Sequence, residues 1–95
     1  MKRPIHPGEI LREEYLEPMG LSSNALAKLL RVPANRITTL VAGKRAMTAD
    51  TALRLAKAFG TTAQFWLNLQ TAYELRRAEQ DHVTLRAIRL IRRVK

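Results

Sequence analysis

The stretch SNALAKLLRVPANRITTL, residues 23–40, decides the fold, because its residue sizes are spaced as two short helices crossing at a tight turn require. Ala27 is a small residue that lets a second helix approach closely, and Val32 closes the turn. The apolar side chains that can converge with Val32 on one core are Leu26, Leu30, Ile37 and Leu40. The sequence therefore predicts a helix-turn-helix unit, with an ordinary helical hairpin as the alternative.

The outward face of the second helix in this stretch is polar, and it presents Asn35, Arg36, Thr38 and Thr39. Such side chains donate and accept hydrogen bonds at base edges and phosphates, as a recognition helix in a DNA major groove does. We therefore expect the unit to bind DNA. In the hairpin alternative the same residues form only a solvated face.

The charge of this 95-residue chain is strongly positive and unevenly distributed. Lys and Arg number 17 against 8 acidic residues, which gives a formal net charge of +9. Residues 28–57 hold seven of the basic side chains and only one acidic side chain. A field of this sign attracts a polyanion without setting a sequence preference. Charge alone would also suit a ribosomal protein or a membrane-surface protein.

Several function classes are disfavoured by what the sequence lacks. There is no cysteine, and Pro4, Pro7 and Gly8 interrupt the N-terminus where a signal peptide needs an unbroken apolar run. No segment approaches the length of a membrane span, so we expect a cytoplasmic protein. The sequence shows no nucleophile elbow, phosphate loop or metal-ligand spacing, which predicts no catalytic residue, cofactor or metal site. His6 and His82 are expected at the surface.

Breaker residues and apolar periodicity predict an all-α fold of five helices, with a helical C-terminal extension. The helix-turn-helix domain is expected over residues 1–80 and the basic extension over residues 81–95. The first helix should open at Pro7 and Gly8 and stop at Pro18 and Gly20. The other helices are expected to begin at Ser22, Pro33, Thr48, and Thr61 or Thr62, with Gly43 and Gly60 ending the third and fourth.

The fifth helix is expected to carry two apolar edges. Its core stripe comprises Phe65, Trp66, Leu69, Ala72 and Tyr73. Leu67 and Leu75 project away from that stripe, which predicts a dimerisation surface unless the C-terminal segment folds back over it. Apolar residues recur at helical spacing in residues 81–95 and favour a helix over a strand. The cations there suit a solvated face, a phosphate contact or an acidic partner.

Two longer motifs carry a family resemblance. Residues 43–75, GKRAMTADTALRLAKAFGTTAQFWLNLQTAYEL, resemble the shared core of the HigA family of antitoxins, a branch of the Xre or lambda-repressor-like helix-turn-helix proteins. Residues 6–30, HPGEILREEYLEPMGLSSNALAKLL, are similar to the first two helices of that family. The most specific part is the FWLNLQ hexapeptide, in which Asn68 and Gln70 offer amides for fixing helix ends or a neighbouring subunit.

The resemblance implies a dimeric autorepressor that binds operator DNA and neutralises a toxin, an mRNA-cleaving endonuclease of the RelE type encoded beside it. The implied DNA contacts are Ser22, Ser23, Ala34, Asn35, Arg36, Thr38 and Thr39, with Lys44 and Arg45 as phosphate clamps. Two positions depart from the family pattern. Glycine is common where Arg31 stands, because the turn often needs a left-handed backbone, and Gln often stands in place of Ser23.

Two alternative functions stay open: a stand-alone or phage-type repressor without a toxin, and a small RNA-binding protein. The scarcity of aromatic residues on the basic face disfavours the RNA-binding alternative. A toxin that binds RNA would itself be basic, so we expect it to contact the acidic N-terminal helix at Glu9, Glu13, Glu14 and Glu17. Alternatively, these carboxylates only favour the helix dipole and stay solvated.

Overall fold

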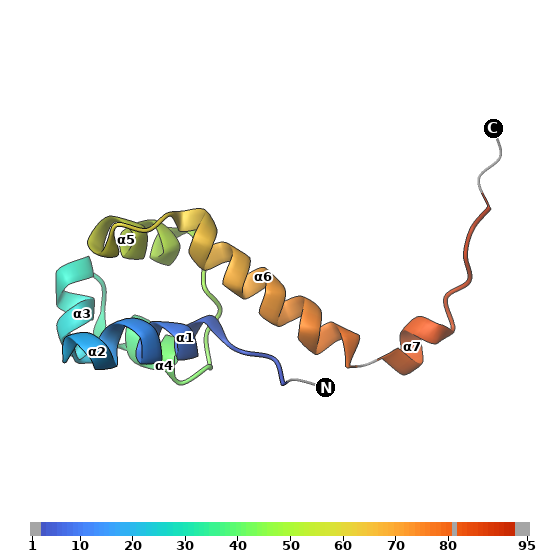
Figure 1. Cartoon of the computed structure of the whole chain (residues 1–95), viewed down its shortest axis with the longest axis horizontal. Helices are drawn as coiled ribbons and strands as arrows, with labels where there is room; N and C mark the ends of the chain where they lie inside the picture. Colours follow the sequence, from blue (N-terminus) through green and yellow to red (C-terminus); the bar gives the residue numbers. More distant parts are fainter. Residues whose placement is uncertain (1–2, 81, 93–95) are drawn as a thin grey trace.

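The computed structural model describes residues 3–80 and 82–92, and Figure 1 shows an arrangement of helices. In chain order the elements are α1 (Pro7–Ile10), the π-helix η1 (Leu11–Leu16), α2 (Glu17–Met19), α3 (Ser23–Leu30), α4 (Ala34–Val41), α5 (Ala49–Phe59), α6 (Ala63–Glu79) and α7 (His82–Arg86). No strand occurs in the described ranges, which confirms the predicted all-α class. Within them, no helix is long and apolar enough to cross a membrane.

The first helix runs without a break through α1, η1 and α2. In its π-helical part, the Glu17 N–H bonds to the Arg12 carbonyl, five residues back along the chain. The prediction that Pro18 stops this helix is wrong, because the chain continues through Pro18 and ends the helix at Gly20, where φ is 62°. A π-helical turn is wider than an α-helical turn, and it leaves room for a proline ring beside the preceding carbonyls.

The predicted starts of the later helices are confirmed. Ser22 Oγ accepts a hydrogen bond from the Ala25 N–H at 3.0 Å, and Thr62 Oγ1 accepts one from the Phe65 N–H at 3.1 Å. Both hydroxyls therefore satisfy N–H groups that have no partner within their helix. The other expected boundary residues lie beside their helices: Pro33 before α4, Thr48 before α5 and Gly60 after α5.

Trp66 lies in the core, and its side chain is fully buried. Its indole N–H donates to Thr61 Oγ1 at 2.8 Å, and the rings of Tyr15 and Phe59 lie 5.1 and 6.5 Å from the indole. Buried apolar side chains around it are Leu11, Leu16, Leu26, Ala27, Leu30, Ile37, Leu40, Met47, Ala52 and Leu55. The predicted convergence of α3 and α4 on one core is thus confirmed, with Val32 partly buried against it.

α1 crosses the end of α4 so closely that only glycine fits at residue 8. A Cβ built on Gly8 would lie 1.8 Å from the Leu40 carbonyl oxygen and 2.9 Å from Val41 Cα. Atoms cannot approach this closely, so any side chain here would force the two helices apart. The N-terminal helix is therefore fixed directly against the predicted recognition helix.

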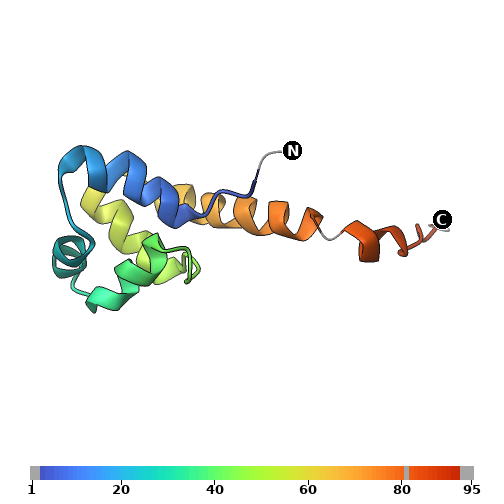
Figure 2. The same cartoon turned by 90° about the horizontal axis from the view of Figure 1, so that it is seen from below.

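α6 begins in the core and then projects from the domain, as two perpendicular views show (Figures 1 and 2). Trp66 and Gln70, one helical turn apart, form its buried face. Three predictions for this helix are wrong as a result. Phe65, at 37%, and Ala72 are exposed, whereas Leu67 is half-buried against the core. Leu75 is 59% exposed, as predicted, because it lies on the part of α6 beyond the core.

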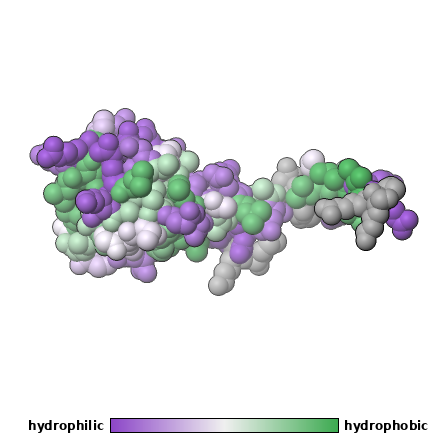
Figure 3. Space-filling model, turned by 90° about the horizontal axis from the view of Figure 1, so that it is seen from above, coloured by the Kyte–Doolittle hydropathy of each residue, from purple (hydrophilic) through white to green (hydrophobic). Residues whose placement is uncertain are grey.

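Within its described residues, 82–92, the C-terminal extension is helical only in α7, and residues 88–92 have no regular structure. The described part does not fold back over the exposed edge of α6 (Figure 1). Figure 3 shows apolar surface along this projecting segment, where the exposed apolar residues are Val83, Leu85, Ile88, Leu90 and Ile91. No other described part of the chain buries these side chains, so packing does not stabilise a helix longer than α7. The predictions for residues 93–95 and for the His82 side chain lie outside the described part.

Candidate nucleic-acid interface

The turn between α3 and α4 depends on Arg31, whose φ of 61° and ψ of 45° lie in the left-handed region. This conformation lets the Arg31 N–H bond to the Lys28 carbonyl at 3.1 Å and the Val32 N–H to the Ala27 carbonyl at 3.0 Å. α3 ends there, and α4 begins three residues later. The left-handed backbone for which the family often has glycine is thus kept at residue 31, although the residue is arginine.

α4 has one buried face and one polar exposed face. Ile37 and Leu40 are fully buried, whereas Ala34, Asn35 and Thr38 are exposed. Thr39, also expected on the polar face, is half-buried, and its hydroxyl donates a hydrogen bond to the Asn35 carbonyl within the same helix. The Thr39 hydroxyl can therefore still accept hydrogen bonds but has no free proton to donate, unlike that of Thr38.

Arg36 lies on the side of α4 that faces α5, and its guanidinium forms an ion pair with Asp50. The same Asp50 oxygen accepts from Arg54 Nε at 3.0 Å, and Arg54 Nη1 donates to the Leu30 carbonyl at the end of α3 at 2.7 Å. The two guanidinium groups, Arg54 first, hold the pKa of the Asp50 carboxyl below its usual range. Asp50 and Arg54 together thus connect α3, α4 and α5.

The N-terminus of α3 carries two more of the expected contacts. Ser22 is exposed, and although its oxygen caps the helix, the hydroxyl proton stays available to a phosphate. Ser23 is half-buried, and serine is also shorter than the Gln that often stands at this position in the family. For both reasons its side chain reaches less far toward DNA. The free N–H groups of a helix N-terminus favour an anion such as phosphate at this end of α3.

Lys44 and Arg45 are exposed on the loop after α4, as a phosphate clamp requires. Gln70 of α6 holds this loop in place, because its Oε1 accepts a hydrogen bond from the Met47 N–H at 2.7 Å. Gln70 Nε2 donates in turn to Glu74 Oε2 at 2.8 Å. The Gln70 amide therefore fixes the loop between α4 and α5, where the sequence had indicated a helix end or a neighbouring subunit.

The prediction of a surface position for His6 is wrong. The side chain is buried, Nδ1 accepts from the Gly8 N–H at 2.9 Å, and the ring packs edge-on against Tyr73 with 4.8 Å between centroids. Burial lowers the His6 pKa, and the nearby Arg45 backbone partly offsets this effect. His6 therefore caps α1 and links it to the loop that carries the clamp.

The acidic N-terminal helix exposes three of its four carboxylates, Glu13, Glu14 and Glu17. Glu9 is half-buried, and its two oxygens accept from Arg3 at 2.9 and 2.7 Å, so it is already neutralised. Glu13 pairs with the neighbouring Arg12 at 3.1 Å, with both side chains largely solvated. The exposed acidic surface therefore lies on η1 and α2 rather than on α1.

The residues that sequence reasoning missed are those that connect elements. The spacing of Asp50 and Arg54, four residues apart on one helix, is a signal that would have indicated their pairing. Nothing local indicates that Arg36 meets Asp50 or that His6 reaches Arg45, because both contacts arise from helix crossing. Among the described residues, no group of three His, Asp or Glu side chains is arranged to hold a metal ion.

Comparison with known proteins agrees with this geometry. Residues 13–66 match the helix-turn-helix family. The chain is 62% identical over 84 residues to virulence-associated protein I of Dichelobacter nodosus, covering 88% of this chain and 78% of that protein. It is 46% identical over 74 residues to antitoxin HigA-1 of Vibrio cholerae, covering 78% and 70%. The structure of Pseudomonas aeruginosa antitoxin HigA with the higBA promoter is similar at a TM-score of 0.88 and 42% identity, covering 95% of this chain and 100% of that one.

The crossing of α3 and α4, with its left-handed turn and polar outer face, defines a helix-turn-helix protein of the kind that binds DNA. The likeness to the HigA proteins extends beyond this unit into α6 and covers nearly the whole chain. The chain belongs to the HigA antitoxin branch of the helix-turn-helix family, a family of regulators and not of enzymes.

Proposed function

We propose that this chain binds operator DNA with α3 and α4 and represses its own promoter. The observation that carries the proposal is the two-sided structure of α4, which buries Ile37 and Leu40 completely while Asn35 and Thr38 face solvent. Polar side chains held on such a rigid helix can read base edges in the major groove. The Pseudomonas aeruginosa HigA structure with promoter DNA, at 42% identity, supports the proposal.

Contacts to the DNA backbone would come from both ends of the helix-turn-helix unit. Ser22 and Ser23 lie at the N-terminus of α3, and Lys44 and Arg45 follow α4. Phosphate contacts of this kind fix the register of the protein on the duplex, and the net charge of +9 adds a general attraction. In this proposal Ala34 contributes only a small apolar contact, for example to a thymine methyl group.

The test compares DNA from upstream of the chain's own gene with random duplex of the same length. Fluorescence anisotropy at fixed salt should show affinity for the upstream DNA at least about 10³-fold higher. Equal affinity for both duplexes would leave only nonspecific electrostatic binding and would overturn the proposal.

We further propose that the chain acts as a homodimer and neutralises a toxin, an mRNA-cleaving endonuclease of the RelE type. Support comes from the antitoxin relatives and from the exposed leucine on α6, Leu75. Leu67 contributes less to a dimer surface, since it is half-buried within its own chain. Co-purification with the product of the neighbouring gene would test the toxin partner, and its failure would favour a stand-alone repressor.

The toxin contact is proposed on the acidic surface at Glu13, Glu14 and Glu17, with Glu9 only at its border because Arg3 neutralises it. An enzyme that binds RNA presents cations, which these carboxylates complement. Reversing the charge of Glu13 and Glu17 together should weaken toxin binding in calorimetry and leave operator binding intact or stronger.

The matched control for this experiment is reversal of Glu79, an exposed acid at the far end of α6. It changes the net charge without touching the proposed surface. Reversing Glu79 changes the net charge by half as much as reversing the Glu13 and Glu17 pair. An effect half as large as that of the pair would therefore mean that only net charge matters, and the toxin surface would then lie elsewhere.

A further inference from the structure

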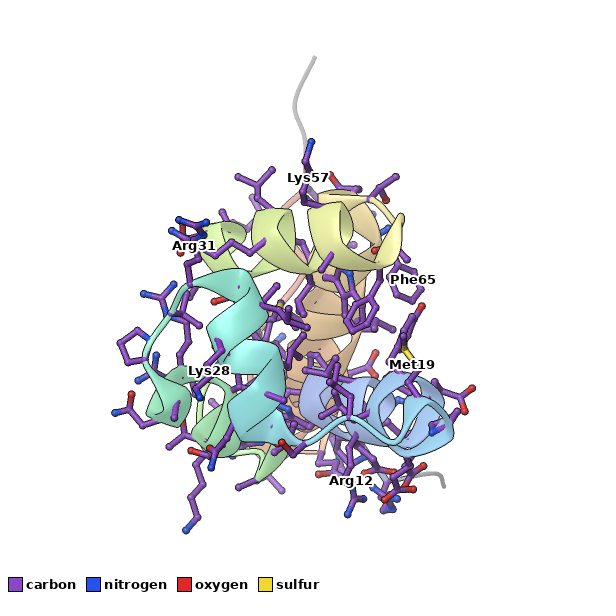
Figure 4. All side chains as sticks on the ribbon, turned by 90° about the vertical axis from the view of Figure 1, so that its left-hand side faces the viewer. Arg12, Met19, Lys28, Arg31, Lys57 and Phe65 are labelled. Carbon is purple, nitrogen blue, oxygen red and sulfur yellow. The ribbon has the colours of Figure 1, made fainter. Side chains whose placement is uncertain are left out.

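Asp50 connects the recognition helix to its neighbours through two arginines. It lies in the first turn of α5, forms an ion pair with Arg36 of α4 and accepts from Arg54 Nε at 3.0 Å. Arg54 also donates to the Leu30 carbonyl at 2.7 Å, where α3 ends. Figure 4 shows α3 and α5 side by side, with Arg31 at the adjacent turn. Asp50 therefore joins α4 to α5 directly, and Arg54 extends the connection to α3.

The ion pair restricts a side chain that would otherwise be mobile. A free arginine has many rotamers, and fixing them on binding DNA costs conformational entropy. Arg36 gives one amino group, Nη1, to Asp50. A guanidinium has five N–H donors in a rigid plane, so several of them stay available for a base or a phosphate. Since only 29% of the Arg36 side chain is exposed, its orientation is already largely set.

The charges at this site are compatible with DNA. An unpaired acid beside a phosphate backbone would repel it, but Asp50 is surrounded by two cations and the group of three side chains carries a net charge of +1. The acid therefore orients Arg36 without making the site negative.

We propose that Asp50 is a positioning residue for operator recognition, holding the Arg36 guanidinium so that its remaining N–H groups face the DNA. This inference rests on the proposed operator binding. A base contact made by a pre-oriented arginine depends on direction, whereas a phosphate contact depends mainly on charge. Asp50 therefore acts on the discrimination between operator and random DNA more than on overall affinity.

The decisive variant is Asp50→Asn, which keeps the size of the side chain and removes its charge. We expect the ratio of operator affinity to random-duplex affinity to fall about three- to ten-fold, part of what a lost bidentate contact would cost. Affinity for random DNA should stay level or rise, because one negative charge is removed. The control Glu79→Gln removes the same charge far from the helix-turn-helix unit and should leave the ratio unchanged.

Two further variants separate positioning from folding. In an Arg36→Ala background, Asp50→Asn should no longer change the ratio, since the group that it positions is absent. Arg54→Ala removes the contact to Leu30 and the bond from Arg54 Nε to Asp50, but keeps the pair between Asp50 and Arg36. It should lower the melting temperature without changing the ratio.

The proposal is overturned if Asp50→Asn raises the ratio, because Asp50 would then compete with DNA for Arg36. It is also overturned if the loss persists in the Arg36→Ala background, because the effect would then come from the fold. If the unmodified chain shows no preference for its operator, operator binding itself fails, and the inference fails with it.

Discussion

Gly8 has no side chain at the point where α1 crosses the end of α4, where a Cβ would meet the Leu40 carbonyl at 1.8 Å. Gly8→Ala should therefore lower the free energy of unfolding by at least about 2 kcal/mol, since backbone on both sides must move. Gly60→Ala is the matched control. A Cβ at residue 60 would have no atom within 4 Å, but φ there is 71°. Gly60→Ala should therefore lower the free energy of unfolding by only about 1 kcal/mol. Urea unfolding of both variants checks this, and a Gly8→Ala cost no larger than that of Gly60→Ala would contradict the steric argument.

Arg31 holds a left-handed conformation that an L side chain adopts at a cost. Arg31→Gly should raise the free energy of unfolding by about 1 kcal/mol, because glycine reaches this conformation without strain. Lys28→Gly, three residues earlier and inside α3, should lower it by about the same amount. Thermal unfolding distinguishes the two, and a destabilised Arg31→Gly would mean that the arginine side chain contributes more than its backbone costs.

His6 makes stability depend on pH in a calculable direction. Burial lowers its pKa from 6.5, so the unfolded chain takes up this proton at a higher pH than the folded chain. The contribution of His6 is complete above the unfolded value and falls as the pH drops toward the folded value. Protonation of Nδ1 would also break its bond from the Gly8 N–H. His6→Asn keeps a capping acceptor and should flatten the change in melting temperature between about pH 6.5 and pH 5; an unchanged slope would assign it to other groups.

At the scale of the element, we expect α4 to contact base edges and the loop that follows it to contact phosphates. Asn35 is exposed on the polar face, whereas Lys44 lies on the loop beyond the helix. Asn35→Ala should weaken operator binding by about 1 to 3 kcal/mol and random-duplex binding far less, because a bidentate amide contact needs the right base. Lys44→Ala should weaken both alike and reduce the salt dependence by about one ion. Equal losses on both duplexes for Asn35→Ala would remove it from the residues that read bases.

At the scale of the whole molecule, the chain measures 54 Å in its longest direction, because α6 and the C-terminal extension project from the domain (Figure 1), and Leu75 is left exposed beyond the core. In a two-fold dimer through this part of α6, two recognition helices would lie about 34 Å apart, one turn of DNA. Leu75→Glu should then give monomers in sedimentation at micromolar concentration. Leu29→Glu, on an equally exposed leucine of α3, should leave the dimer intact. A monomeric unmodified chain would count against this assembly.

The sequence by itself determined the helices and the polar face that makes the chain a DNA-binding candidate. Helix starts at Ser22 and Thr62 follow from side chains that bond to N–H groups three residues away, and such bonds are local. Apolar spacing placed Ile37 and Leu40 in the core for the same reason. The left-handed turn at residue 31 was indicated only by the family resemblance, because arginine itself disfavours that backbone conformation.

Only the tertiary structure decided which side chains meet across helices. The pairing of Arg36 with Asp50, the burial of His6 and the need for glycine at residue 8 depend on crossing angles and distances between helices. Which face of α6 is buried likewise depended on how Trp66 packs in the core. As a result, Leu67 is half-buried and Phe65 is partly exposed. Periodicity gives the faces of a helix but not the shape of the surface that it packs on, and that shape is set by residues distant in sequence.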